Sequence, residues 1–411
     1  MNINEIKTKY IENLKLINAY SHALKVFHFD HSTIAPKKSM AERNDTLSIL
    51  SNIIFQKQMD SEHIELLKTL YNNRNELDEY TKRLVEINYN NYIKSQFITP
   101  ELQYKYSLAT SNGYTAWLEA KEKQDYQIFK PYLEKIIDMT KQYYSYRYPN
   151  TENLYDCMLN EYEDGMTSDK IDKLFTELKQ EIIPIVKNLK VTKIGEPRNT
   201  YTKEELLDIA EYLLDYIGFD NERGALGIYP HGYTCKLNNN DVRITFSNNK
   251  SIFDHVCTVI HEGGHGIFEQ SVGEHLSKYP IYDIGKYALH ESQSRFFENI
   301  LGRNVNFWIP IYDELKEKLK LEITVEDFVS YLNKPEPSFI RTEADELTYC
   351  LHVMVRYEIE KMMLEDGFNF DTLPTLWNQK YKEYLGVDVP NDKEGVLQDV
   401  HWTSGVGYFF S

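Results

Sequence analysis

The sequence predicts a mainly α-helical fold that carries one small β-hairpin. Glycine (18 residues) and proline (13 residues) are scarce in a chain of 411 residues, against typical shares of about 7% and 5%. Because these two residues interrupt helices most strongly, their scarcity favours long helices. Apolar residues also recur at helical spacing along most of the chain. The exception lies between Gly224 and Gly232, where glycines and a proline gather just before two strand-like runs.

Amphipathic helices are expected throughout the N-terminal part of the chain. The first repeats apolar residues from Ile3 to Leu24 and stops near Pro36. Pro100 marks a later boundary, and Pro131 is expected to open another helix, because the first helical turn tolerates proline. The expected helices are residues 2–30, two or three segments within 41–95, and then 100–123, 131–145, 168–189 and 202–216.

The β-hairpin is expected in the middle of the chain. Its strands are the runs 233–237 and 242–246, which the turn-forming residues 238–240 join. A helix then begins near Ser251, and no repeat or linker divides the sequence, so we expect a single domain over residues 1–411. The later helices are expected at residues 285–303, 313–320, 325–332, 341–365 and 373–385.

The charge balance and the cysteines limit the classes of function and location. The net charge is −17 and the pI is near 5.2, which argues against nucleic acid because its phosphates would be repelled. The four cysteines are widely spaced without a C-x-x-C pair, as expected for thiols in a reducing compartment. The N-terminus does not resemble a signal peptide, and no uncharged apolar run approaches about 18 residues. These features predict a soluble, cytoplasmic protein without a membrane span.

Residues 261–265 form an H-E-x-x-H pattern on the helix that begins near Ser251. Positions i and i+4 share one face of a helix, so His261 and His265 can bind the same ion. Glu262 lies beside that ion and can take a proton from metal-bound water, an arrangement typical of zinc hydrolases. The two glycines inside the motif each cost about 1 kcal/mol relative to alanine in a helix. We therefore expect a neighbouring helix or strand to pack closely there.

A catalytic zinc ion usually takes a third protein ligand and keeps one position for water. Glu269 and Glu274 follow the motif too closely to turn back to the ion. A return by the next helix would bring Glu291 opposite the two histidines. Glu298 follows two turns later on the same side and competes with Glu291 for this role.

Successive motifs of the chain resemble those of the carboxypeptidase Taq family of zinc metallocarboxypeptidases. Besides H-E-x-x-H at 261–265, residues 241–245 match D-x-R-x-T and residues 290–294 match H-E-S-Q-S. Residues 340–345 match I-R-x-x-A-D, and residues 395–402 match G-x-x-Q-D-x-H-W. Weaker similarity reaches the N-terminal part, so the resemblance covers essentially the whole chain.

The resemblance implies that His261, His265 and Glu291 bind Zn²⁺, for which Co²⁺ can substitute, and that Glu262 is the general base. It also implies a homodimer and a peptide substrate that loses its C-terminal residue. The expected fold is a large, helical, zincin-like metallopeptidase with a deep cleft, in which the small sheet lies beside the H-E-x-x-H helix. Residues 1–220 would form one wall of the cleft and 221–411 the catalytic half.

An exopeptidase also needs a cation that binds the terminal carboxylate of its substrate. Arg341 is the first candidate, because a guanidinium can bind a carboxylate at both oxygens. An ion pair with Asp345, four residues on, is the structural alternative for this arginine, and Arg243 is the second candidate. His401 can donate to the oxyanion of the tetrahedral intermediate. Asp254 or Asp345 can orient the ligand imidazoles.

Two departures from the family pattern concern substrate binding. The family's H-P-F segment reads His231-Gly232-Tyr233 here, and His231 remains a substrate-binding candidate. Family members continue into further helices after a segment similar to residues 407–409, so Tyr408 is the candidate hydroxyl near the end of this sequence. An oligoendopeptidase on the same scaffold is the alternative activity. The short C-terminal segment also leaves open an inactive, helical metal-binding protein.

Overall fold

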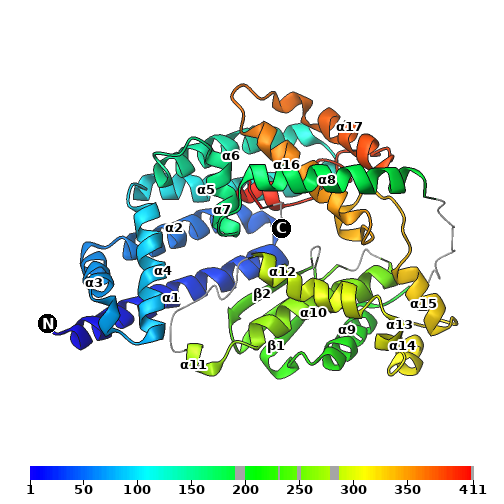
Figure 1. Cartoon of the computed structure of the whole chain (residues 1–411), viewed down its shortest axis with the longest axis horizontal. Coiled ribbons are helices and arrows are strands. Elements are labelled where there is room, and N and C mark those ends of the chain that lie inside the picture. Colours follow the sequence, from blue (N-terminus) through cyan, green and yellow to red (C-terminus); the bar gives the residue numbers. More distant parts are fainter. Residues whose placement is uncertain (190–199, 230–231, 248–250, 278–286, 409–411) are drawn as a thin grey trace.

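The computed structural model describes residues 1–189, 200–229, 232–247, 251–277 and 287–408. Helices make up most of this part of the chain, and the strands form one small sheet (Figure 1). The expected mainly α-helical fold, with a small sheet beside the H-E-x-x-H helix, is confirmed. Among the described helices, none is long and apolar enough to cross a bilayer.

The N-terminal helices begin where side chains cap their first turns. Asn2 and Glu5 form a capping box at the first helix, and Thr99 caps the fifth. Asp125 accepts a first-turn N–H and starts the sixth helix ahead of Pro131, so the expected start at residue 131 is wrong. The helices are α1 (Ile3–Thr33), α2 (Met40–Gln58), α3 (Ser61–Asn72), α4 (Glu79–Ser95), α5 (Pro100–Lys123), α6 (Tyr126–Arg147), α7 (Leu154–Tyr162), α8 (Ser168–Lys187) and α9 (Lys203–Ile217).

In the described residues, a three-stranded sheet precedes the H-E-x-x-H helix. Its strands are β1 (Gly224–Ile228), β2 (Tyr233–Asn238) and β3 (Asp241–Phe246), in the order β1-β3-β2. β2 and β3 form the expected antiparallel hairpin, whereas β1 pairs with β3 in parallel. The sequence did not predict β1, because its glycines indicate a turn. A side chain at Gly224 would overlap the ring of Phe219, so packing accounts for that glycine.

The C-terminal helices follow the sheet. They are α10 (Ile252–Gln270), α11 (Glu274–Ser277), α12 (Tyr287–Arg295), α13 (Val305–Trp308), α14 (Tyr312–Lys318), α15 (Val325–Leu332), α16 (Tyr349–Met363) and α17 (Leu373–Leu385). α12 runs directly into the π-helical segment η4 (Phe296–Leu301). Short 3-10 segments lie at Lys37–Ser39, Arg74–Glu76, Asn221–Arg223, Arg341–Glu343, Phe370–Thr372 and His401–Ser404.

The helix expected at residues 341–365 is wrong in its first part. A single 3-10 turn covers Arg341–Glu343, and α16 begins at Tyr349. Between them, the side chain of Asp345 accepts the backbone N–H groups of Leu347 and Thr348. This local capping competes with helix formation, which explains why the helix starts later than the apolar pattern suggests.

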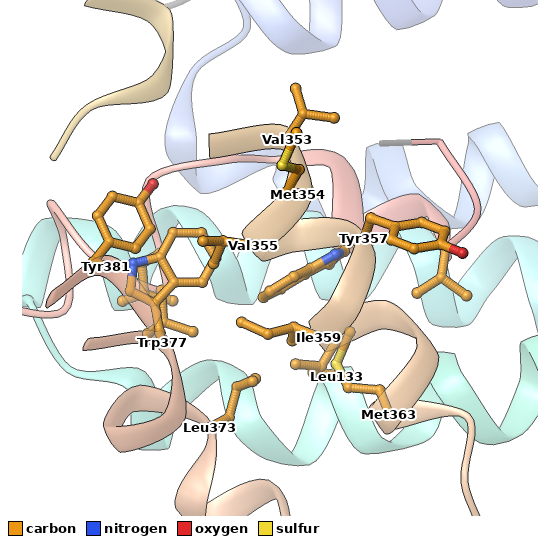
Figure 2. Close-up of a cluster of buried hydrophobic side chains, with 14 of the residues drawn as sticks. Leu133, Val353, Met354, Val355, Tyr357, Ile359, Met363, Leu373, Trp377 and Tyr381 are labelled. Atoms are coloured by element: carbon orange, nitrogen blue, oxygen red, sulfur yellow. The ribbon is translucent and has the colours of Figure 1, made fainter. Parts of the chain in front are cut away.

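Three larger hydrophobic clusters hold the described elements together. One joins α1–α4, and a second packs α9, the sheet, α10 and α13–α15. The largest joins α5–α8 to α16, α17 and residues 396–406. Figure 2 shows part of it, with side chains of α16 and α17 gathered around Trp377 and Ile359. Trp117 of α5 and Trp402 belong to this same cluster, so the N-terminal and C-terminal halves of the chain share a core.

Candidate metal centre

α10 and α12 lie against each other at the H-E-x-x-H motif. A Cβ at Gly264 would lie 2.8 Å from Cα of Ser294 and 3.1 Å from the carbonyl oxygen of Gln293, both on α12. A Cβ at Gly263 would lie 2.6 Å from two apolar side chains of α9. The expected close packing at these glycines is confirmed, because a larger residue at position 264 would push α12 away.

His261, His265 and Glu291 form the one group of metal-ligating side chains found in the described part of the chain. One donor atom from each lies within 4.8 Å of the others. Nε2 of His265 lies 3.3 Å from Oε2 of Glu291, and Nε2 of His261 lies 3.8 Å from Oε1. Tetrahedral zinc with bonds near 2.1 Å separates its ligand atoms by about 3.4 Å. The three side chains therefore fit a four-coordinate metal ion that keeps one position for water.

Arg295 holds the carboxylate of Glu291 from the side. Its Nε donates to Oε1 of Glu291 at 3.1 Å, one helical turn away. Burial alone would raise the pKa of Glu291, but the hydrogen bond with His265 and the charges of His261 and Arg295 hold it well below its usual range. A carboxylate that binds a metal ion must be ionised, and the hydrogen bond from Arg295 stabilises this form. Arg295 was not predicted, although its i,i+4 spacing from Glu291 is a usable signal.

Glu298 faces the opposite nitrogen of His261. Its Oε2 lies 2.8 Å from Nδ1 of His261, and Nη1 of Arg295 donates to the same oxygen at 3.1 Å. Burial raises the pKa of Glu298, but His261, Arg295 and Arg303 together lower it overall. An ionised carboxylate here accepts a hydrogen bond from the Nδ1–H group of His261. The lone pair of Nε2 is then available to a metal ion. In this geometry Glu298 lies on the Nδ1 side of His261, whereas Glu291 lies nearer its Nε2.

A longer chain of polar side chains orients His265. Its Nδ1 lies 2.6 Å from Nδ1 of His290, and Nε2 of His290 lies 3.0 Å from Oε1 of Glu269. Lys236 of β2 donates to the other oxygen of Glu269 at 2.6 Å. The carboxylate of Glu269 favours the His290 tautomer with its proton on Nε2, so Nδ1 of His290 can accept from His265.

The orienting groups differ from those named by the sequence. Asp254 or Asp345 was expected behind the imidazoles, whereas Glu298 and His290 occupy these positions. Asp345 instead caps the turn before α16. Which side chains lie behind the imidazoles depends on the relative orientation of α10 and α12. Residue spacing alone does not define this orientation.

Glu262 is buried, with 8% of its surface exposed. The hydroxyl of Thr234, on β2, donates to Oε2 of Glu262 at 2.6 Å and also lies 3.0 Å from the Glu262 carbonyl oxygen. These contacts fix the carboxylate between α10 and the sheet. Thr234 was not predicted, because a threonine in a strand carries no signal of such a role.

Arg341 belongs to a buried polar network. Its Nε donates to Oδ1 of Asp399 at 3.0 Å, and its Nη1 donates to the hydroxyl of Tyr349 at 3.0 Å. Arg356 pairs with the other oxygen of Asp399. The partner of Arg341 is therefore Asp399, and the alternative pair with Asp345 is wrong. The guanidinium of Arg295 lies 4.0 Å from the centre of the Tyr349 ring, so this network reaches the metal centre.

His401 and Tyr408 form a stacked pair, with ring centroids 4.5 Å apart and planes 12° apart. Tyr287 of α12 meets Tyr408 edge-on. Burial raises the pKa of Tyr408, while the charge of Arg341 lowers it and that of Glu291 raises it further. The phenol therefore lies within electrostatic reach of both Arg341 and the metal-site carboxylate.

Arg243 and His231 are the two remaining substrate-binding candidates, and only Arg243 lies in the described part of the chain. Nε and Nη2 of Arg243 donate to the carboxylate of Asp241 at 2.9 Å each, and the guanidinium lies 5.1 Å from the ring centre of Phe29 on α1. Arg243 thus joins the sheet to α1. His231 lies outside the described residues.

Comparison with known proteins bears on this site. A model of the carboxypeptidase Taq (M32) metallopeptidase family matches residues 9–411. The chain belongs to this family. The matched residues include all of the candidate metal centre and the polar network around Arg341.

Named relatives of this M32 chain agree with the match. Carboxypeptidase 1 of Bacillus subtilis (strain 168) is 40% identical over 100% of this chain and 83% of its own length. The solved structure of a Pyrococcus furiosus carboxypeptidase has a TM-score of 0.87 at 31% identity, covering 100% of this chain and 84% of that one. An M32 carboxypeptidase structure from Deinococcus radiodurans R1 has a TM-score of 0.86 at 30% identity, covering 99% and 83%.

The M32 protein is a metallocarboxypeptidase, and a divalent metal ion is part of its chemistry. The oligoendopeptidase and the inactive metal-binding protein are not favoured. The recognition of the family from the ordered motifs is confirmed.

Proposed function

We propose that this metallocarboxypeptidase uses Zn²⁺ held by His261, His265 and Glu291 to release C-terminal amino acids from peptides. The observation that carries the proposal is the group of three donor atoms within 4.8 Å of one another, with a hydrogen-bonded partner behind each imidazole. Two imidazoles and one carboxylate are a ligand set that catalytic zinc commonly takes. Imidazole also suits neighbouring divalent metals, so Co²⁺ is proposed as a substitute.

Glu262 is proposed as the proton carrier of the reaction. When bound, the metal ion polarises the scissile carbonyl and lowers the pKa of a coordinated water toward about 7. Glu262 takes a proton from the attacking water and delivers it to the departing amine. The 2.6 Å contact with Thr234 supports this role, because it holds the carboxylate in one orientation.

Arg341 is proposed to bind the terminal carboxylate of the substrate. Its side chain keeps 12% of its surface exposed, while Asp399 and Tyr349 hold the guanidinium plane in place. A guanidinium fixed in this way loses little freedom when a carboxylate arrives. Arg243 remains the second candidate, and His231 is a further proposed substrate contact.

His401 and Tyr408 are proposed to donate hydrogen bonds to the oxygen that becomes negatively charged during the attack. Their stacked rings support a shared role. Because burial raises the pKa of Tyr408, its hydroxyl keeps its proton at neutral pH and can donate.

We also propose a single catalytic domain over residues 1–411, a homodimer and a cytoplasmic location. The hydrophobic cluster that α5–α8 share with α16 and α17 supports the single domain. Family resemblance supports the homodimer. The cysteines support the location, because none of the four forms a disulfide in the described structure. The net charge of −17 supports peptide over nucleic acid as the partner.

Metal depletion and restoration, followed by mass spectrometry of the products, tests the proposed activity. The purified protein is stripped with a chelator and given a peptide that ends in a free carboxylate. We expect single C-terminal residues to be released stepwise after Zn²⁺ or Co²⁺ is restored, and no release without metal.

The control for this experiment is the same peptide with an amidated C-terminus. We expect its hydrolysis to be at least about 100-fold slower, because a neutral amide cannot form the charge-assisted, bidentate hydrogen bonds that a carboxylate forms with a guanidinium. Internal cleavage, or equal rates for both peptides, would point to an oligoendopeptidase. No hydrolysis with either metal would point to an inactive metal-binding protein.

A further inference from the structure

Glu360 is a fully buried carboxylate away from the metal ligands. It lies on α16 within the largest hydrophobic cluster, with 0% of its surface exposed. Oε1 accepts from Nε1 of Trp402 at 3.0 Å, and Oε2 accepts from the backbone N–H of Gly407 at 2.9 Å and from the hydroxyl of Tyr155 at 3.0 Å. Three donors therefore converge on one carboxylate.

The chemistry of these donors explains why a carboxylate is needed. The indole N–H of Trp402 and the backbone N–H of Gly407 can only donate, and they reach different oxygens of Glu360. A glutamine offers a single acceptor oxygen, so its amide would turn an N–H toward one of them. The pKa of Glu360 is raised to about 7, because the effect of burial outweighs the three hydrogen bonds and the charge of Arg356, which lower it. Burying this group is costly, so a specific role is expected of it.

Two of the contacts of Glu360, those with the Trp402 indole and the Gly407 backbone, lie at the two ends of one segment. Trp402 directly follows His401, and Gly407 directly precedes Tyr408. Gly405 has a φ of 114° and Gly407 a φ of 101°, both in the left-handed region that favours glycine. A Cβ at Gly407 would also lie 2.9 Å from Cβ of Met158, so the segment is closely packed on α7.

We propose that Glu360 is a positioning residue, which binds both ends of the segment from Trp402 to Gly407 and thereby holds the rings of His401 and Tyr408 together near the metal centre. This inference rests on the proposed function, in which those two rings stabilise the oxyanion. Glu360 touches neither substrate nor metal in this account. Its effect on the reaction is indirect, because it determines where the stacked pair lies relative to the reacting carbonyl.

Glu360→Gln tests the proposal by kinetics and by hydrogen–deuterium exchange. We expect kcat to fall about 10- to 100-fold, as displacements near 1 Å at a catalytic group can cause, while KM and metal content stay within about twofold. Amide exchange in residues 401–408 is expected to rise about tenfold. On a background that carries both His401→Ala and Tyr408→Phe, Glu360→Gln should lower kcat little further, because neither proposed oxyanion donor remains to be displaced.

Matched controls separate positioning from general destabilisation. Glu358, on the same helix, binds Lys179 and Lys380. Glu358→Gln is expected to lower the melting temperature without faster exchange in residues 401–408. Tyr155→Phe removes the third donor but keeps both contacts to the segment, so near wild-type kcat is expected. Trp402→Phe is the milder variant if Glu360→Gln does not fold.

Two outcomes would overturn the inference: unchanged exchange in residues 401–408 of Glu360→Gln, or unchanged kcat in a variant that folds. Failure of the proposed function has a different signature. In that case the wild type itself shows no metal-dependent release of C-terminal residues, whereas the exchange measurement still reports whether Glu360 holds the segment.

Discussion

Glu262→Gln is expected to lower turnover by about three to four orders of magnitude while the protein keeps its metal. A glutamine amide keeps the shape of the side chain but cannot take a proton from water. The side chain is held by Thr234 and lies beside the three ligands without being one of them, so metal binding does not require its charge. Steady-state kinetics on a peptide with a free C-terminus, together with metal analysis of the same sample, measure both effects.

Thr234→Val serves as the matched control for this variant. It removes the hydroxyl that orients Glu262 but leaves the base in place, so a fall in kcat of only about tenfold is expected. If Glu262→Gln kept turnover within tenfold of wild type, another group would have to carry the proton. Loss of metal in Glu262→Gln would instead mean that this carboxylate helps to hold the ion.

Arg341→Gln is expected to reduce kcat/KM for peptides with a free C-terminus by about 10²- to 10³-fold, the effect of removing one partner of a buried ion pair. The slow hydrolysis of the amidated peptide should change little, because that substrate carries no carboxylate. Arg356 still pairs with Asp399 when Arg341 is replaced, so the network is expected to remain folded. Rates on the two peptides, compared for the same enzyme preparation, measure the difference.

Arg243→Gln is the matched control for Arg341→Gln. Its guanidinium already binds Asp241 through two nitrogens. We therefore expect Arg243→Gln to lose stability but to discriminate between the free and amidated peptides as well as the wild type does. If discrimination vanished in Arg243→Gln and survived in Arg341→Gln, the second candidate would be the carboxylate-binding residue. An equal loss on both peptides in Arg341→Gln would show a purely structural role.

Local patterns were enough to predict most of the fold. Helical periodicity and scarce glycine led to a mainly α-helical chain, and alternating runs with a polar turn led to the β2–β3 hairpin. β1 was missed because its parallel pairing, Gly224 opposite Val242, joins segments that carry no hairpin signal. The late start of α16 was missed because the Asp345 side chain accepts backbone N–H groups there and so competes with helix formation.

The candidate site shows the same difference between residues that local patterns predict and residues that depend on tertiary contacts. H-E-x-x-H defines its own geometry, since His261 and His265 share a helix face whatever surrounds them. The role of Glu298 depends on the rotation of α12 and on the π-helical segment η4, which carries it to Nδ1 of His261. Thr234 and Glu360 depend wholly on tertiary contacts, because nothing in their local sequence distinguishes them.

The identity of the third ligand is the central claim, and metal content after dialysis against low free zinc tests it most directly. Wild type is expected to hold about one zinc ion per chain. Glu291→Gln is expected to lose it, whereas Glu298→Gln, which removes only the partner of His261, should bind zinc about 10- to 100-fold more weakly and still fill at higher zinc. Full zinc content in Glu291→Gln, with an empty site in Glu298→Gln, would contradict the account.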